Sequence, residues 1–114
     1  MGKDIEVRAE VKGDVHILYL KGDVTAVTGG EVEAAYQAVS GQGAVKILIH
    51  FDKDGYINSG GIAVLIQIEA MAKKKGQTIR LTGLSDHFKK IFGMVGLTRY
   101  TEIHASEEAA LKGL

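Results

Sequence analysis

The run of residues 45–51 constrains the fold of this chain more than any other stretch. It reads Val-Lys-Ile-Leu-Ile-His-Phe, which is apolar almost throughout. A strand of this kind is typically covered on both faces, as at the centre of a sheet with parallel pairing. A turn over 52–55 follows, and from Ser59 apolar residues recur at helical spacing until Gly76. The sequence therefore predicts a central strand–turn–helix unit in which Ser59 opens the helix.

The segments before this unit indicate a hairpin and a helix. Residues 5–11 alternate between apolar and charged side chains, and a Gly-Asp turn leads from them to a second strand over 15–20. Thr28 and Glu31 have the spacing of a capping box, in which two side chains satisfy free N–H groups at a helix start. The Ser-Gly-Gln-Gly stretch at 40–43 ends this helix.

The segments after the unit continue the alternation of strands and helices. A short strand is expected over 78–82, a helix between Ser85 and Gly96, and a last strand over 100–103, before a terminal helix that Ser106 opens. One face of the helix after Ser85 carries Phe88, Ile91, Phe92 and Val95. The order β-β-α-β-α-β-α-β-α predicts a single α/β domain over residues 1–114, with a small mixed sheet packed with helices.

Composition narrows the class of protein. The formal net charge of zero argues against a broad nucleic-acid or anionic-membrane surface. The absence of cysteine excludes disulfides and thiolate metal sites and fits a reducing compartment. No apolar run approaches the roughly 20 residues that span a bilayer, and the N-terminus lacks the apolar core of a signal peptide. We expect a cytoplasmic protein that does not insert into membranes.

Ser59 is the candidate functional residue. Serine is a good N-cap, and most serines at helix starts serve only as caps. The functional alternative is phosphorylation, because a phosphate at this place meets free N–H groups and the positive end of the helix dipole. Gly60 and Gly61 would leave that backbone uncovered.

Enzymatic functions find little support. The nucleophile elbow Gly-x-Ser-x-Gly is missing, since Ile57 stands two residues before the serine, and there is no phosphate-binding loop of the Gly-x-x-x-x-Gly-Lys type. The histidines do not pair at zinc-ligand spacing. The acids Asp23, Asp52 and Asp54 lie in turns, where carboxylates usually cap the backbone. We predict no enzyme, and no catalytic residue, metal or cofactor.

Three segments carry a resemblance to a known family. Residues 56–65 read Tyr-Ile-Asn-Ser-Gly-Gly-Ile-Ala-Val-Leu, 21–24 read Lys-Gly-Asp-Val, and 92–97 read Phe-Gly-Met-Val-Gly-Leu. In this order they resemble the core motif, the turn after the second strand and the Gly-Leu element of the STAS domain. That family includes the bacterial anti-sigma factor antagonists, and the resemblance covers nearly the whole chain.

The resemblance implies a switch at Ser59. In the family, the serine of an Asp-Ser-Ser/Thr-Gly motif is phosphorylated by a serine kinase that is also the anti-sigma factor, and the unphosphorylated form binds that kinase and releases the sigma factor. Here the aspartate is replaced by Asn58 and the second hydroxyl residue by Gly60, and Thr25 stands near a position that is often acidic. The implied partner-binding residues are Asp23, Thr25, Asn58, Ser59, Gly60, Gly61 and Ile62.

Two functions follow from the resemblance. The first is a signalling phosphoprotein in transcription regulation, which binds a serine-kinase anti-sigma factor and is switched at Ser59. The second is a STAS subunit that docks constitutively on another assembly, such as a lipid-transport ATPase or a stress-signalling complex. In that case Ser59 is only a helix cap. The sequence leaves the oligomeric state open.

Overall fold

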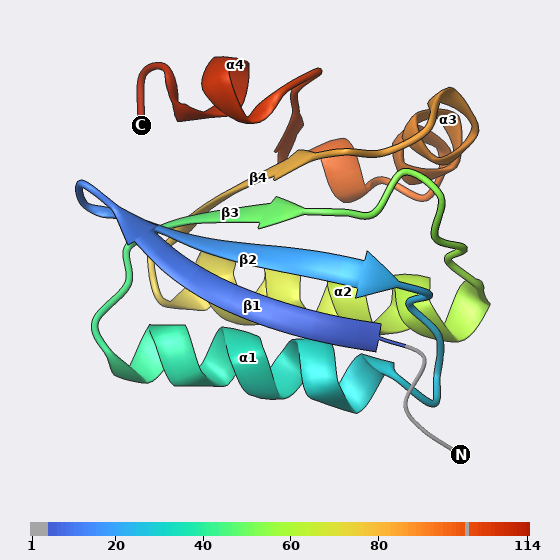
Figure 1. Ribbon diagram of the computed structural model, residues 1–114, viewed down its shortest axis with the longest axis horizontal. Coiled ribbons are helices and arrows are strands. Elements are labelled where there is room, and N and C mark those ends of the chain that lie inside the picture. Colours follow the sequence, from blue (N-terminus) through green and yellow to red (C-terminus); the bar gives the residue numbers. More distant parts are fainter. Residues whose placement is uncertain (1–4, 100) are drawn as a thin grey trace.

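The strands of the chain form one mixed sheet, seen in a computed structural model that describes residues 5–99 and 101–114 (Figure 1). β1 and β2 form the expected antiparallel hairpin, while β2, β3, β4 and β5 run parallel. The strands lie side by side in sequence order. Their bounds are β1 Ile5–Lys12, β2 Val15–Gly22, β3 Lys46–His50, β4 Thr78–Thr82 and β5 Glu102–Ile103.

The helices lie on both sides of this sheet. Figure 1 shows α1 and α2 together under one face and the short α4 over the other, with α3 beyond the end of β4. The predicted order of strands and helices is confirmed, with a 3-10 turn, η1, added before β5. The helical bounds are α1 Gly29–Gly41, α2 Ser59–Lys74, α3 Asp86–Met94, η1 Leu97–Arg99 and α4 Glu107–Leu111.

Strand β3 is covered on both faces, as its apolar run predicts. Ile47 and Ile49 pack into the large core between the sheet and the helices α1 and α2. Leu48 points the other way, into a smaller cluster with Ala110 of α4. All three β3 residues are at most 1% exposed. This double burial agrees with the position of β3 between β2 and β4, because helices cover both faces of a parallel sheet.

Two expectations for the C-terminal part differ from the structure. The strand expected over 100–103 is reduced to Glu102–Ile103; residue 100 lies outside the described residues. The Thr101 hydroxyl instead donates a hydrogen bond to the Glu69 carboxylate at 2.6 Å. Val95 was expected on the apolar face of this helix, but it is the C-cap that follows the last residue of α3, Met94, and it is 45% exposed.

Helix α4 is fastened to the sheet by polar contacts at both of its ends. The Glu107 carboxylate accepts hydrogen bonds from Lys12 Nζ at 2.5 Å and from the Tyr19 hydroxyl at 2.7 Å. The Arg80 guanidinium donates to the carbonyl oxygens of Ala110 and Lys112. Within the described residues, no helix is long and apolar enough to cross a membrane.

The Glu107 contacts make a pH-dependent contribution to stability. Hydrogen bonds from Lys12 and Tyr19 lower the pKa of Glu107 in the folded protein. This contribution is therefore present above the unfolded pKa, about 4.3, and is lost as the pH falls through the folded value. Urea unfolding is expected to show wild type more stable than Glu107→Gln near neutral pH, with the difference shrinking in acid.

The neighbouring exposed acid provides a control for this measurement. Glu108→Gln changes the same charge on the same helix, one residue away from the contact with the sheet. It is expected to stay close to wild type at each pH. If wild type and Glu107→Gln differ in unfolding free energy by the same amount at neutral and acid pH, the pH-dependent role of the Glu107 carboxylate is contradicted.

Candidate functional site

Two loops at the same end of the sheet build the site. They follow β2 and β3, which are parallel neighbours, so both loops leave the sheet at its carboxyl edge. The Val24 N–H donates to the Tyr56 carbonyl at 2.8 Å, and the Asn58 N–H donates to the Val24 carbonyl at 3.2 Å. These bonds form an isolated parallel bridge between Val24 and Ile57. The loop after β2 is thereby held directly against the start of α2.

The turn acids cap the backbone, as expected. Asp23 Oδ1 accepts a hydrogen bond from the Tyr56 N–H at 2.9 Å, which adds a side-chain bond to the pairing of the two loops. Asp52 accepts from the Gly22 N–H and from the Asp54 N–H, each at 3.0 Å. Asp23 and Asp52 therefore fix the loop geometry. Among the described residues, no group of acids and histidines is placed to hold a metal ion.

Asn58, and not Ser59, caps helix α2. The Asn58 backbone is extended, and its Oδ1 atom accepts from the Gly61 N–H at 2.9 Å. Ser59 is the first residue of the helix, and it is exposed. The prediction that Ser59 is the cap is wrong because asparagine caps as well as serine and stands one residue earlier. The Ser59 hydroxyl is thus not needed to start the helix.

Gly60 and Gly61 are contact points, which corrects the expectation that they leave the backbone uncovered. A Cβ atom at Gly60 would lie 2.6 Å from the Ala26 Cβ atom. A Cβ atom at Gly61 would lie 2.2 Å from the Val24 carbonyl oxygen. Both distances are shorter than van der Waals contact, so the loop after β2 reaches the helix only because neither residue has a side chain.

The predicted capping box at α1 does not form. The Thr28 hydroxyl accepts from the Thr25 N–H at 2.9 Å and donates to the Asp23 carbonyl at 2.7 Å, and it makes no capping bond to the helix. Thr25 Oγ1 in turn accepts from the N–H groups of Val27 and Thr28. The threonines prefer the turn because short hydroxyl side chains bond to nearby backbone. Thr25, a candidate partner-binding residue, shapes this loop.

Exposed apolar side chains occur on the segments that meet at the start of α2. Val27 is 89% exposed, Tyr56 59% and Ile66 43%. Ser59, Ala63 and Ile66 share one outward face of α2, because residues four and three apart lie above one another on a helix. Ala26 is also exposed and packs on Gly60. We call the following set the Ser59 surface: Ala26, Val27, Tyr56, Ser59, Ala63 and Ile66.

The Ser59 surface differs from the predicted residue set. Ile62 is half-buried and packs against the core, so it supports the surface more than it forms it. Val27 and Tyr56 were not singled out from the sequence. They could have been found because each is a large apolar residue in a loop, where side chains tend to be exposed: Val27 is β-branched and Tyr56 is aromatic. The Tyr56 ring also meets the edge of Phe88, with centroids 6.0 Å apart, which places α3 next to the surface.

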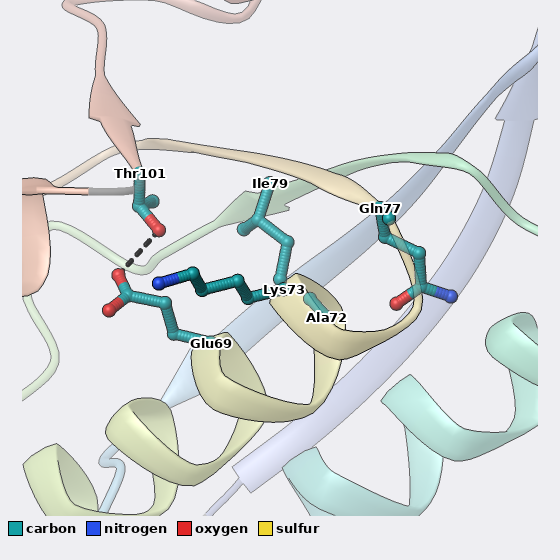
Figure 2. Close-up of a pocket in the computed structure, with 7 residues that line it drawn as sticks. Glu69, Ala72, Lys73, Gln77, Ile79 and Thr101 are labelled. Carbon is teal, nitrogen blue, oxygen red and sulfur yellow. Dashed lines mark hydrogen bonds between the residues drawn. The ribbon is translucent and has the colours of Figure 1, made fainter.

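A pocket of about 300 Å³ lies at the opposite end of α2 (Figure 2). Ala72 and Ile79 form its apolar part, and Glu69 accepts the hydrogen bond from Thr101 across it. This pocket shares no residue with the Ser59 surface. The pocket is therefore separate from the Ser59 surface.

The comparisons with known proteins point to one family. A family model described as "Mlab, STAS domain" matches residues 7–104. The chain is 23% identical over 101 residues to proteins named anti-sigma-B factor antagonist from Listeria monocytogenes and Listeria innocua, covering 88% of this chain and 89% of each relative.

Solved structures show the same fold. A putative anti-sigma factor antagonist from Thermotoga maritima has a TM-score of 0.82 at 17% identity, covering 93% of this chain and 92% of that one. The anti-sigma factor antagonist from Mycobacterium paratuberculosis gives 0.79 at 17% identity, with 94% and 91% covered. The phosphorylated form of the Bacillus cell fate determinant SpoIIAA gives 0.67 at 18% identity, with 91% and 96% covered.

The close approach at Gly61 predicts opposite effects for two similar substitutions. Gly61→Ala places a methyl group against the Val24 carbonyl and is expected to destabilise the protein by about 1–3 kcal/mol. Gly93→Ala in α3 meets no atom within 4 Å and is expected to stabilise by up to about 1 kcal/mol, because alanine favours helix. Urea unfolding of both variants checks this. Equal changes of unfolding free energy in the same direction for both variants would contradict the role assigned to Gly61.

Proposed function

Because this chain belongs to the STAS family, we propose that it is an anti-sigma factor antagonist, a cytoplasmic regulator that binds an anti-sigma factor through the Ser59 surface. The match to the Listeria antagonists over most of both chains supports this role. The fold shared with SpoIIAA supports it as well. The surface itself exposes apolar side chains on two segments that are hydrogen-bonded to each other, and exposed apolar patches mark sites of protein contact.

We further propose that phosphorylation of Ser59 switches the binding. The observation that carries this proposal is that Ser59 is exposed at the first position of α2 while Asn58 makes the cap. The first turn of α2 carries no acidic residue, so the positive end of the helix dipole is not already matched by a carboxylate. A phosphate on Ser59 would be stabilised there.

The consequence for binding follows from the neighbours of Ser59. Val27 and Ile66 offer apolar contact on the same surface. A phosphate that carries about −1.5 to −2 charge would have to lose water when a partner covers these side chains. The unphosphorylated form is therefore the binding form, and the partner is a serine-kinase anti-sigma factor that adds the phosphate.

A second candidate function rests on the two replaced motif positions. Asn58 serves as the helix cap, and Gly60 serves as the contact point for Ala26. Both residues thus have structural roles in this chain. In this alternative the Ser59 surface docks constitutively on another assembly, such as a lipid-transport ATPase or a stress-signalling complex, and no phosphate is added.

Intact-mass spectrometry after incubation with the cognate serine kinase and ATP tests the switch. One phosphate is expected on wild type and none on Ser59→Ala. Ser59→Asp is expected to weaken kinase binding at least about tenfold, whereas Ser59→Ala keeps it. Ser59→Asn is the matched control, because it has the size of the aspartate without the charge, and it is expected to bind like wild type.

The outcomes separate the two candidate functions. If wild type gains no phosphate from a kinase that is shown to be active on another substrate, the switch is excluded. Equal kinase affinity of the aspartate and asparagine variants would exclude it as well. Capture of a transporter ATPase by wild type, lost when Val27→Asp disrupts the surface, would establish the second candidate.

A further inference from the structure

The outer edge of β1 is open. β1 is the first strand of the sheet, and the described residues place no strand beyond it (Figure 1). It is eight residues long, and an edge of this length offers unpaired N–H and C=O groups to another strand. Proteins usually protect such an edge, so its side chains indicate whether it is blocked or built to pair.

The hairpin turn determines which backbone groups face outward. Gly13 has φ +61° and is followed by Asp14 with negative φ, so the two residues connect Lys12 directly to Val15. In a two-residue hairpin the residues that flank the turn form a hydrogen-bonded pair, and such pairs alternate along the ladder. The even residues of β1 therefore bond to β2. The odd residues, from Val11 back to Ile5, turn their N–H and C=O groups outward.

The even residues carry charges of alternating sign on one face of the sheet. Their order is Glu6, Arg8, Glu10 and Lys12. If β1 of a second copy lies antiparallel with Ala9 facing Ala9, each charge faces its opposite. Glu6 then faces Lys12 of the second copy, and Arg8 faces its Glu10. Because a twofold axis relates the copies, each of these contacts occurs twice.

The odd residues fit the same register. Val7 faces Val11 of the second copy on the helix-covered side of the sheet, on either side of the alanine pair. Val11 is 59% exposed and Ala9 is exposed, although both lie on the side where Ile5 and Val7 join the core. Pairing would cover this apolar surface. It would also match outward N–H groups with outward C=O groups, since odd residues face odd residues.

Neighbouring registers are opposed by charge. A shift by two residues in one direction sets Arg8 against Arg8 and Glu6 against Glu10. A shift in the other direction sets Glu10 against Glu10 and Arg8 against Lys12. Like charges directly opposite each other destabilise a strand pair. One register is therefore favoured over both of its neighbours, which distinguishes this edge from one whose charges only prevent pairing.

The charged side chains are already held on the face where the contacts would form. The Arg8 guanidinium lies 4.3 Å from the centre of the Tyr19 ring and pairs with Glu10 of its own strand. Arg8 and Glu10 nevertheless remain 61% and 40% exposed. In the paired arrangement the two arginines and two glutamates form one four-charge network around the axis, and networks stabilise more than isolated surface pairs.

We propose that the protein associates with a second copy of itself by antiparallel pairing of β1 with β1, which joins the two five-stranded sheets into one. Because the contact is confined to one pair of strands, we expect the association to be weak and to require high protein concentration. Ile5 lies next to Gly22 at the end of the sheet that bears the site. The two Ser59 surfaces therefore stand at opposite ends of the joined sheet, open to two partners.

A charge exchange tests the pairing. Sedimentation of wild type over increasing concentration is expected to show a rise from the monomer mass of 12.2 kDa toward twice that value. Arg8→Glu and Glu10→Arg are each expected to weaken self-association about tenfold or more, because each sets like charges together twice. A mixture of the two variants is expected to recover the association, since the carboxylates of one chain then face the guanidinium groups of the other at both positions.

Amide hydrogen exchange tests the mode of pairing. At high concentration, protection is expected to increase at Val7, Ala9 and Val11 and to stay unchanged at Arg8 and Glu10, whose N–H groups already bond to β2. A mass that stays at 12.2 kDa up to about 1 mM would overturn the proposal. Association that survives both single substitutions, or a mixture that fails to recover it while each variant stays folded, would overturn it as well.

Discussion

The backbone pairing of Val24 with the segment before α2 is the contact on which the candidate site depends. It joins a loop that follows β2 to a loop that follows β3, and it fixes where the first turn of α2 lies. Asp23 adds a side-chain hydrogen bond between the same two loops. Without these bonds Val27, which follows β2, would be separate from Tyr56 and Ser59, which follow β3. With them, they share one surface.

The pairing of Val24 with this segment also explains which residue types surround it. Gly61 has no side chain because the Val24 carbonyl occupies the place of its Cβ atom, and Gly60 makes room for Ala26 in the same way. The threonines of the loop bond to one another and to the Asp23 carbonyl, so the short segment between β2 and α1 holds its shape without regular structure. Rigidity here comes from many short bonds to the backbone.

Much of the fold could be predicted from the sequence because its determinants are local. The apolar run of β3 required cover on two faces, the bounds of β4 agree with its pattern, and Ser85 and Ser106 cap the helices that they were expected to open. The resemblance located the candidate switch region in the chain. Apart from the resemblance, which covers nearly the whole chain, each of these features depends on residues that are close together in the sequence.

What the sequence did not reveal depends on competition between neighbours or on distant contacts. Asn58 and Ser59 are both good caps, and spacing alone does not decide between them. Thr28 was expected to cap α1, but the carbonyl of Asp23, five residues earlier, takes its hydroxyl. The role of Gly61 depends on Val24, which is far away in the chain. Such features become visible only once the fold is known.

The separation of Asn58 from Ser59 has a consequence for how this protein can change over time. Because Asn58 alone starts the helix, the identity of residue 59 is not tied to the stability of the fold. A serine there can be lost, regained or exchanged for another polar residue while α2 stays in place. Under the function proposed above, the residue that a partner recognises can therefore change without loss of the residue that starts the helix.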